Sequence, residues 1–519
     1  MEFLPNISPR TYQEVIFNTC TEKNCLVVLP TGLGKTLIAL MLAIERMRKF
    51  PGKKVVFLAP TRPLAEQHID YFKKNLPELF GDMQLFTGSV SAAKRKELWE
   101  TADIVFSTPQ CVANDIENGL YTLEDVCLLV EDEAHRCFRN YSYNYVAQKY
   151  METAEHRRIL GLTASPGSDL GKIKEICKNL SIEEVELRTR ESPDVAPYLQ
   201  ELEFEKIVVD LPEEHRKIRD ALFQLFNHYV DELRNRKVLF TFASKTELIN
   251  LQKRLMLSIA RGNKNFNNLL AASACAQAVR LQHALELIET QTLLGFHKYL
   301  KELLHQAAKK TSKGVVRLVS KPEFSFALKK TEELLQSGYE HPKIDVLIEI
   351  IKTEISKDEK IKIIVFSQYR ETARILCKTL NTLEGIRAKV FVGQAIKKSE
   401  DGVSGLSQKE QKEIIREFSS GEINVLCATS IGEEGLDIPE VNAVIFYEPV
   451  PSAIRAIQRA GRTARLIPGK LIVLITRKTR DEGHFYAARA KERKMHSAIS
   501  SVREDLRNNI NSEFQKRLE

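Results

Sequence analysis

A short run near the N-terminus has the residue types that bind phosphate. The apolar run Leu26–Leu29 leads into Pro-Thr-Gly-Leu-Gly-Lys-Thr at 30–36 and then into an amphipathic segment. A strand, a glycine-containing loop and a helix in this order direct backbone N–H groups at phosphate oxygens. Lys35 would add a cation for these oxygens, and Thr36 a hydroxyl for Mg²⁺. Glycine is usual where this chain has Leu29, and the alternative is a chance Gly-Lys-Thr turn.

A cluster of carboxylates follows a second apolar run. Residues 130–135 read Val-Glu-Asp-Glu-Ala-His and end the run Val126–Glu131. Carboxylates at the end of a parallel strand lie at the edge where such sheets bind ligands. Asp132 would hold Mg²⁺, and Glu133 would polarise a water for attack on a phosphate. A charged turn is the alternative, but the upstream phosphate-binding loop favours the chemical interpretation.

A third cluster supplies positive charge. The segment 458–465 reads Gln-Arg-Ala-Gly-Arg-Thr-Ala-Arg, with arginine at intervals of three. That spacing places Arg459, Arg462 and Arg465 on one face of a helix, and planar guanidinium groups spread charge onto phosphate oxygens. A solvated basic helix is the alternative. Because the cluster is far along the chain from Lys35, the two together imply a nucleotide site in a cleft between two domains.

Two stretches contain the elements that would position these clusters. Each alternates short β-rich runs with helical periodicity, which is typical of α/β domains with parallel sheets covered on both faces. In residues 1–200 the expected strands are Leu26–Leu29, Val55–Ala59, Asp103–Phe106, Val126–Glu131 and Ile159–Leu162. In residues 343–480 they are Ile361–Phe366, Ala388–Val392, Ile423–Cys427, Ala443–Tyr447 and Lys470–Ile475.

The remaining segments have a different composition. Apolar residues recur at helical spacing in residues 201–342, which predicts a helical insert between the two α/β domains. Residues 481–519 are expected to form a helical tail. The tail carries Met495, Ile499 and Val502 on one face, and we expect that face to pack on the second α/β domain.

Composition excludes several classes of protein. The chain has 519 residues, of which 43% are hydrophobic and 28% charged, as in ordinary globular proteins. Its 9 cysteines are scattered without a Cys-x-x-Cys pair, which argues against zinc and disulfide frameworks. No apolar run reaches the roughly 18 residues that span a bilayer, and no secretory signal is recognisable, so we expect an intracellular protein. The net charge of +8 weakly favours a polyanionic partner.

The clusters and the motifs between them resemble superfamily 2 helicases of the DEAH-box type. This resemblance implies an α/β fold with two RecA-like parallel-sheet lobes and a helical insert between them, and an ATP-hydrolysing enzyme. The further motifs that carry it are 9–13, 59–64, 87–88, 107–110, 163–166, 365–370 and 428–437.

Four segments are similar to a narrower group, the archaeal Hef and Fanconi anaemia M family of fork-remodelling helicases. They are 29–36, 391–394, 405–411 and 446–452. In that family the insert is a thumb-like domain. The chain departs from the family pattern at Ala460 and Ala464, where Arg and Gly are frequent.

The resemblance assigns roles residue by residue. Catalytic roles fall on Lys35, Asp132, Glu133, Gln458, Arg462 and Arg465. ATP would contact Arg10, Gln13, Thr31, Gly32, Gly34, Lys35, Thr36, Gly435 and Asp437, with Gln13 on the adenine and Mg²⁺ on Thr36 and Asp132. Nucleic acid would contact Arg62, Gly88, Thr108, Ser367, Arg370, Gly393 and Thr429.

The function expected from these roles is that of an ATP-dependent DNA helicase or translocase on forked or branched DNA, in repair and fork processing. A duplex-RNA-stimulated ATPase and an ATP-gated nucleic-acid clamp stay open as alternatives. The sequence shows no Glu-Arg-Lys nuclease cluster on a strand, so whether a nuclease or sliding clamp acts in trans stays open, as does the oligomeric state. The expected location is the cytoplasm, at an archaeal nucleoid, or the nucleus of a eukaryote.

Overall fold

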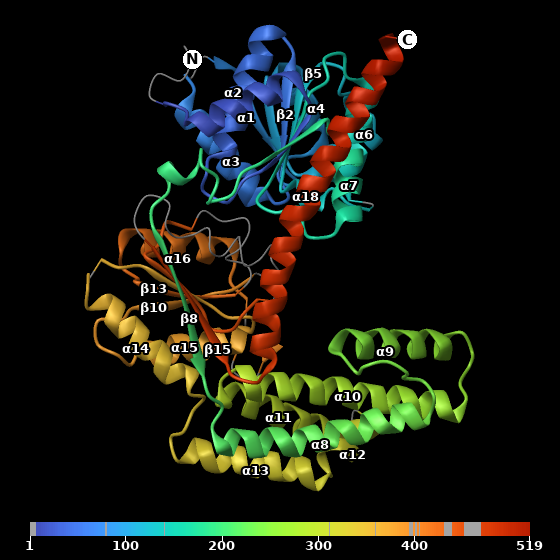
Figure 1. Ribbon diagram of the computed structural model, residues 1–519, viewed down its shortest axis with the longest axis vertical. Helices are drawn as coiled ribbons and strands as arrows, with labels where there is room; N and C mark the ends of the chain where they lie inside the picture. The colour runs from blue at the N-terminus through green and yellow to red at the C-terminus, as the bar shows by residue number, and fades with distance from the viewer. Residues whose placement is uncertain are drawn as a thin grey trace.

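The computed structural model shows two parallel-sheet lobes, a helical insert and a long C-terminal helix (Figure 1). It describes residues 7–77, 80–139, 141–310, 312–358, 360–393, 398–399, 402–403, 405–429, 438–450 and 469–518, of which 398–399, 402–403 and 509–518 are described by their backbone alone. Among the described helices, none has the length and apolar character needed to cross a membrane.

The first lobe is a sheet of seven parallel strands in the order β3-β4-β2-β5-β6-β1-β7. Its strands are β1 (Cys25–Val28), β2 (Lys54–Leu58), β3 (Met83–Phe86), β4 (Ile104–Ser107), β5 (Val126–Asp132), β6 (Ile159–Thr163) and β7 (Glu184–Leu187). The helices are α1 (Thr11–Glu22), α2 (Lys35–Lys49), α3 (Arg62–Asn75), α4 (Ala92–Thr101), α5 (Pro109–Glu117), α6 (Ser142–Thr153) and α7 (Leu170–Asn179). Two short 3₁₀ turns, η2 (Ala134–Arg136) and η3 (Ala196–Tyr198), complete it.

Both faces of this sheet are covered. Along β2, Val55 and Phe57 join the core formed with α1, α2 and α3, whereas Val56 and Leu58 join the core formed with α4 to α7. The alternation follows from the two-residue period of a strand. Burial on both faces explains why β2 reads as an unbroken apolar run in the sequence.

The second lobe is a sheet of six parallel strands in the order β10-β13-β9-β14-β15-β8. Its strands are β8 (Leu202–Val209), β9 (Ile363–Phe366), β10 (Ala388–Phe391), β13 (Val425–Ala428), β14 (Ala443–Phe446) and β15 (Gly469–Thr476). Helices α14 (Lys343–Ile355) and α15 (Arg370–Leu380) cover one face, and α16 (Gln408–Ser420) covers the other. A small antiparallel pair joins β11 (Lys398–Ser399) to β12 (Gly402–Val403).

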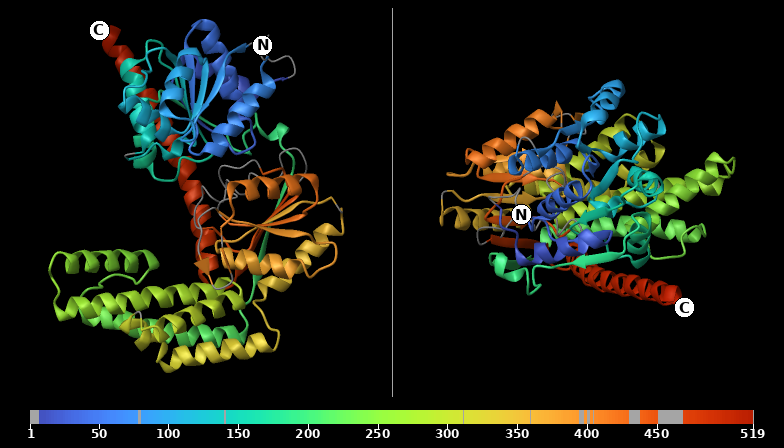
Figure 2. Two further views of the ribbon diagram at one scale, coloured as in Figure 1. Left: turned by 180° about the vertical axis from the view of Figure 1, so that it is seen from behind. Right: turned by 90° about the horizontal axis from the view of Figure 1, so that it is seen from above.

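The insert is a bundle of helices that extends from the second lobe, at the end of the molecule away from the first lobe (Figure 1; Figure 2, left). It contains α8 (Glu213–Asn235), α9 (Lys245–Ala260), α10 (Phe266–Thr290), α11 (Leu293–Ala308), α12 (Lys313–Val319) and α13 (Pro322–Gln336). These helices share a core of their own, so the bundle is a separate packing unit.

Two expectations about the domain layout need correction. The helical insert was expected to begin at residue 201, but β8 pairs with β15 over its whole length and so belongs to the second sheet. The strand lies at a sheet edge, carries three charged residues in its first five positions and is buried only at its last residue, so it lacks the buried apolar run that predicts central strands.

The C-terminal helix, α18 (Arg480–Leu518), packs on a different lobe from the one expected. We expected its apolar face to pack on the second lobe. Instead Met495, Ile499 and Val502 are buried in the core of the first lobe, and Phe485, near the start of the helix, packs on the second lobe. The helix therefore runs from the base of the insert along the second lobe to the first (Figures 1 and 2).

Candidate functional site

The carboxyl edge of the first sheet carries two neighbouring groups of predicted site residues. Strands β5, β6 and β1 lie side by side. They are followed by the carboxylates, the segment 163–166 and the glycine loop, respectively, and we call this part of the edge the loop half. Strands β3, β4 and β2 also lie side by side, and we call this the open half. Gly88, Thr108 and Arg62 follow these three strands. Parallel strands bring all these positions to one edge.

The glycine loop is held by the segment at the N-terminus of the chain. Gly34 has φ 80°, in the left-handed region, and a Cβ at this position would clash with Nε2 of Gln13. Gln13 is buried and donates from Nε2 to the Leu33 carbonyl at 3.1 Å, and the Tyr12 hydroxyl donates to the same carbonyl at 2.8 Å. Lys35, the first residue of α2, donates to the Leu29 carbonyl at 2.7 Å. The loop is therefore set in place by the protein itself.

An aromatic ring that the sequence analysis missed lies beside this segment. The Arg10 guanidinium is 5.3 Å from the centre of the Tyr198 ring. The Tyr198 hydroxyl is 3.0 Å from the hydroxyl of Thr11, and its ring packs edge-on against Tyr12 at 5.8 Å. Tyr198 is 187 residues from Thr11 along the chain, so no local pattern could have connected them.

The carboxylate of Asp132 is buried and held by a histidine from α3. Nε2 of His68 donates to Oδ2 of Asp132 at 2.8 Å, and the Tyr143 hydroxyl donates to the Asp132 main-chain carbonyl at 2.6 Å. Burial alone would raise the pKa of Asp132. The hydrogen bond and charge of His68, together with the charge of Lys35, outweigh burial and lower this pKa below its usual value. Asp132 is therefore an ionised carboxylate at neutral pH.

Glu133 has an unusual backbone conformation. Its φ is 52°, which non-glycine residues rarely adopt and which stores strain. Oε2 of Glu133 lies 3.2 Å from Nδ1 of His135, and the same ring nitrogen lies 3.2 Å from the Thr163 hydroxyl. The end of β5 is thereby linked to the end of β6. The segment after β6 is linked in turn to the C-terminal helix, because the Ser165 hydroxyl donates to Sδ of Met495 on α18 at 2.8 Å.

The open half has accessible side chains. Arg62 and Gly88 are exposed and Thr108 is half-buried. Arg62 donates to Oε1 of Glu66 at 2.7 Å and to the Ser89 hydroxyl at 3.3 Å. Its guanidinium group is thus oriented but reachable from solvent.

The second lobe repeats the arrangement of the open half. Gly393, Thr429 and Ser367 follow β10, β13 and β9, which are neighbours in the sheet, and Arg370 is the first residue of α15. Ser367 and Thr429 are buried, and their main-chain N–H groups donate to Ala428 and Phe391 at 2.9 and 3.1 Å. Each lobe therefore gathers its predicted nucleic-acid residues at one sheet edge. Gly435, Asp437, Gln458, Arg462 and Arg465 lie outside the described residues.

The two lobes meet beside the open half. Nζ of Lys412 on α16 lies 2.9 Å from Oε2 of Glu66 on α3, which also pairs with Arg62. Burial would raise the pKa of Glu66, but Lys412 and Arg62 together lower it. A cavity lined by Thr36, His68 and Lys412, among others, lies next to this ion pair.

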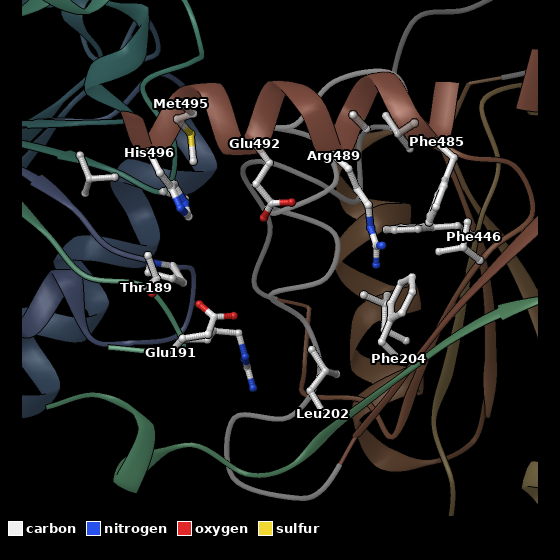
Figure 3. A pocket seen from close by; sticks show the side chains of 18 of the residues that line it. Thr189, Glu191, Leu202, Phe204, Phe446, Phe485, Arg489, Glu492, Met495 and His496 are labelled. Carbon is white, nitrogen blue, oxygen red and sulfur yellow. The ribbon is translucent and has the colours of Figure 1, made fainter. Parts of the chain in front are cut away.

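A second cavity, of about 360 Å³, lies between both lobes and α18 (Figure 3). Pro30 and Ala164 of the loop half line it, as do Phe204 of β8 and Phe446 of β14. The Arg489 guanidinium on α18 lies 5.0 Å from the centre of the Phe204 ring. The helix is thus in contact with both lobes along one continuous stretch.

Comparison with known proteins identifies the fold. The DEAD/DEAH box helicase family matches residues 10–173, and the helicase conserved C-terminal domain matches residues 342–467. A helical bundle described as that of a putative ATP-dependent RNA helicase matches residues 214–338. The crystal structure of the Hef helicase domain of Pyrococcus furiosus superposes with a TM-score of 0.71 at 42% identity, over 92% of this chain and 98% of that one. The chain belongs to the Hef-type family of superfamily 2 helicases.

Curated relatives of this Hef-type chain are longer than it is. A putative ATP-dependent RNA helicase of Methanocaldococcus jannaschii is 38% identical over 505 residues, which is 96% of this chain and 62% of the relative. The Fanconi anemia group M protein homolog of Mus musculus is 33% identical over 540 residues, 97% of this chain and 26% of the relative. The chain thus spans less than two thirds of either.

The Hef-type site has the donors that suit Mg²⁺. Thr36 offers a hydroxyl and Asp132 an ionised carboxylate, and Mg²⁺ is usually held through one or two carboxylates and the phosphates of a nucleotide. No cluster of three or more His, Cys, Asp or Glu side chains suited to a metal ion occurs within the described residues.

Proposed function

We propose that the chain hydrolyses ATP and uses the cycle to translocate along DNA or separate its strands, with forked or branched DNA as the substrate. The division of the first sheet edge carries this proposal. A preset loop and an ionised carboxylate lie directly beside a row of accessible residues in the first lobe, and the second lobe carries its own predicted residues after three neighbouring strands. An enzyme that couples nucleotide hydrolysis to movement on a strand needs both groups on one scaffold.

In the proposed ATP site the loop N–H groups and Lys35 bind the phosphates, and Arg10 and Gln13 lie toward the base. Thr36 and Asp132 would hold Mg²⁺, which supplies charge neutralisation at the phosphates. Glu133 orients and deprotonates the attacking water. Gln458, Arg462 and Arg465 of the second lobe, with Gly435 and Asp437, would complete the site when the lobes close.

The proposed strand site spans both lobes. Arg62, Gly88 and Thr108 face it from the first lobe, and Ser367, Arg370, Gly393 and Thr429 from the second. Hydroxyls, backbone N–H groups and arginines bind phosphate oxygens without reading bases, so we expect recognition of DNA structure rather than sequence. Binding should weaken steeply with salt because phosphate contacts release counterions.

The choice of DNA rests on the relatives. Beside the mouse Fanconi protein homolog, an ATP-dependent DNA helicase of Schizosaccharomyces pombe is 32% identical over 514 residues, 96% of this chain and 60% of the relative. The Methanocaldococcus relative is described as an RNA helicase, which favours a duplex-RNA-stimulated ATPase as the second candidate. A DNA substrate would place the chain at the nucleoid of an archaeal cell, or in the nucleus of a eukaryotic one.

One experiment separates these candidates. ATP hydrolysis is measured without nucleic acid and with single-stranded DNA, duplex DNA, forked DNA or duplex RNA, and Glu133→Gln serves as the blank. We expect the strongest stimulation from forked DNA, followed by ATP-dependent strand separation of the fork. Stimulation by duplex RNA alone would contradict the proposal. A long-lived ATP-dependent complex without strand separation would indicate a clamp.

A further inference from the structure

His68 is a buried histidine on α3 to which the sequence analysis gave no role. Its ring packs against Phe57 of β2, with ring centres 4.4 Å apart, and Nε2 lies 2.8 Å from Oδ2 of Asp132. The residue is 6% exposed. Packing on Phe57 fixes the plane of the ring, so the direction of its hydrogen bond is fixed as well.

The proton shared between His68 and Asp132 belongs on the histidine when Asp132 is ionised. A carboxylate that binds Mg²⁺ is ionised and accepts hydrogen bonds, so in that role Nε2 of His68 carries the hydrogen. One oxygen of Asp132 is thereby held in place, and the Tyr143 hydroxyl holds the main-chain carbonyl of the same residue at 2.6 Å. The contact from His68 restricts rotation of the Asp132 carboxylate, and the contact from Tyr143 holds the backbone from which that side chain extends.

His68 also faces the nucleotide side of the lobe. It lines one cavity with Thr36, the other residue that would hold Mg²⁺. We propose that His68 is a positioning residue, which orients the Asp132 carboxylate for the Mg²⁺–nucleotide complex. The inference rests on the proposed function, because that proposal makes Asp132 a ligand of Mg²⁺. Partners that orient metal-binding side chains typically contribute roughly ten- to hundredfold to metal affinity.

The test measures binding rather than hydrolysis. A Glu133→Gln chain, which retains a fluorescent ATP analogue unhydrolysed, is titrated with the analogue at a series of Mg²⁺ concentrations. With His68→Phe, which keeps a ring against Phe57 but removes the donor, we expect the half-saturating Mg²⁺ concentration to rise by roughly ten- to hundredfold. With His68→Gln the half-saturating Mg²⁺ concentration should return most of the way to that of the parent chain, because the glutamine amide N–H can donate to the carboxylate.

Two controls isolate the contact. His156 is another histidine stacked on a phenylalanine, Phe50, with ring centres 3.9 Å apart, so His156→Phe should leave the Mg²⁺ dependence unchanged. In an Asp132→Asn background, His68→Phe should add nothing further, since the carboxylate on which it acts is gone.

The outcomes are distinguishable. An unchanged Mg²⁺ dependence in His68→Phe would overturn the positioning role. An equal loss of nucleotide affinity with and without Mg²⁺ in both His68 variants would also overturn it, because it would show a structural role; thermal unfolding of each variant identifies that case. If the parent chain itself shows no Mg²⁺-dependent nucleotide binding, the proposed function fails rather than this inference.

Discussion

The loop half and the open half of the first sheet edge hold their side chains in different ways. In the loop half the polar side chains form hydrogen bonds within the protein: Lys35 bonds to the Leu29 carbonyl, and Asp132 bonds to His68. In the open half Arg62 and Gly88 are exposed. The same parallel sheet thus presents a preset site and an accessible one, a few strands apart.

This difference matches two kinds of chemistry. Groups that stabilise charge in a reaction work best when they are held in place before the reaction and shielded from water. Groups that hold a moving strand must be reachable and must release it again, so they gain from exposure. Helix α3 belongs to both halves, since Arg62 begins it and His68 follows less than two turns later. Four predictions test whether the two halves are separable.

The largest effect is expected at the loop half. Glu133→Gln should lower the rate of ATP hydrolysis by roughly 10²- to 10⁴-fold, because the amide cannot accept a proton from the attacking water. Nucleotide and DNA affinity should stay near those of the parent chain. Phosphate release and fluorescence binding assays check this, and a parallel loss of DNA binding would show that the halves are not separable.

A smaller effect follows from adding a methyl group to the loop. Gly34→Ala places a Cβ against the Gln13 amide in a left-handed backbone, so we expect nucleotide affinity to fall by about tenfold or more. Gly52 has φ 79° but no atom within 4 Å of an added Cβ, so Gly52→Ala carries the backbone strain without the clash. Equal losses of nucleotide affinity in both variants would mean that the contact with Gln13 is unimportant.

In the open half, removing one positive charge should weaken DNA binding without affecting the nucleotide site. Arg62→Ala should weaken DNA binding severalfold and reduce the slope of log affinity against log salt by about one, as expected for one lost phosphate contact. Nucleotide affinity without DNA should not change. Salt titrations of DNA binding measure the slope, and an unaltered slope would remove Arg62 from the strand site.

The smallest effect is expected where the halves meet the second lobe. Lys412→Ala removes a solvent-accessible ion pair with Glu66, and such pairs contribute about 0.2–1 kcal/mol. The folded state lowers the pKa of Glu66, so this stabilisation is present above the usual value of 4.5 and is lost as the pH falls through the lowered pKa. Thermal unfolding at several pH values tests this, with the parent and variant converging in acid.

Most of the strands that the sequence predicted lie inside the two large sheets, whereas those it missed lie at edges. The ten expected strands overlap β1, β2, β4, β5 and β6 of the first sheet and β9, β10, β13, β14 and β15 of the second. The strands missed in the two large sheets, β3, β7 and β8, all lie at sheet edges, as does β10, which was predicted; the short pair β11 and β12 was also missed. Central strands are covered on both faces and read as apolar runs, whereas an edge strand such as Glu184–Leu187 contains charged residues that interrupt the pattern.

The residues of the site divide in a similar way. The glycine loop and the carboxylates were predictable because their chemistry needs fixed residue types at fixed spacing after a strand. His68 and Tyr198 gave no such signal, since each acts through a contact with a residue far away in the chain. The apolar face of α18 was recognisable, but the surface on which it packs was not.

The sequence by itself determined the local order of this protein: which segments form central strands, which loop can surround a phosphate and which strand ends in carboxylates. These properties depend on neighbouring residues, so the pattern of types along the chain is enough. Only the tertiary structure decided that β8 returns to the second sheet, that α18 reaches the first lobe and that His68 holds Asp132. Those contacts join distant parts of the chain, and their stability comes from packing and hydrogen bonding that no local pattern records.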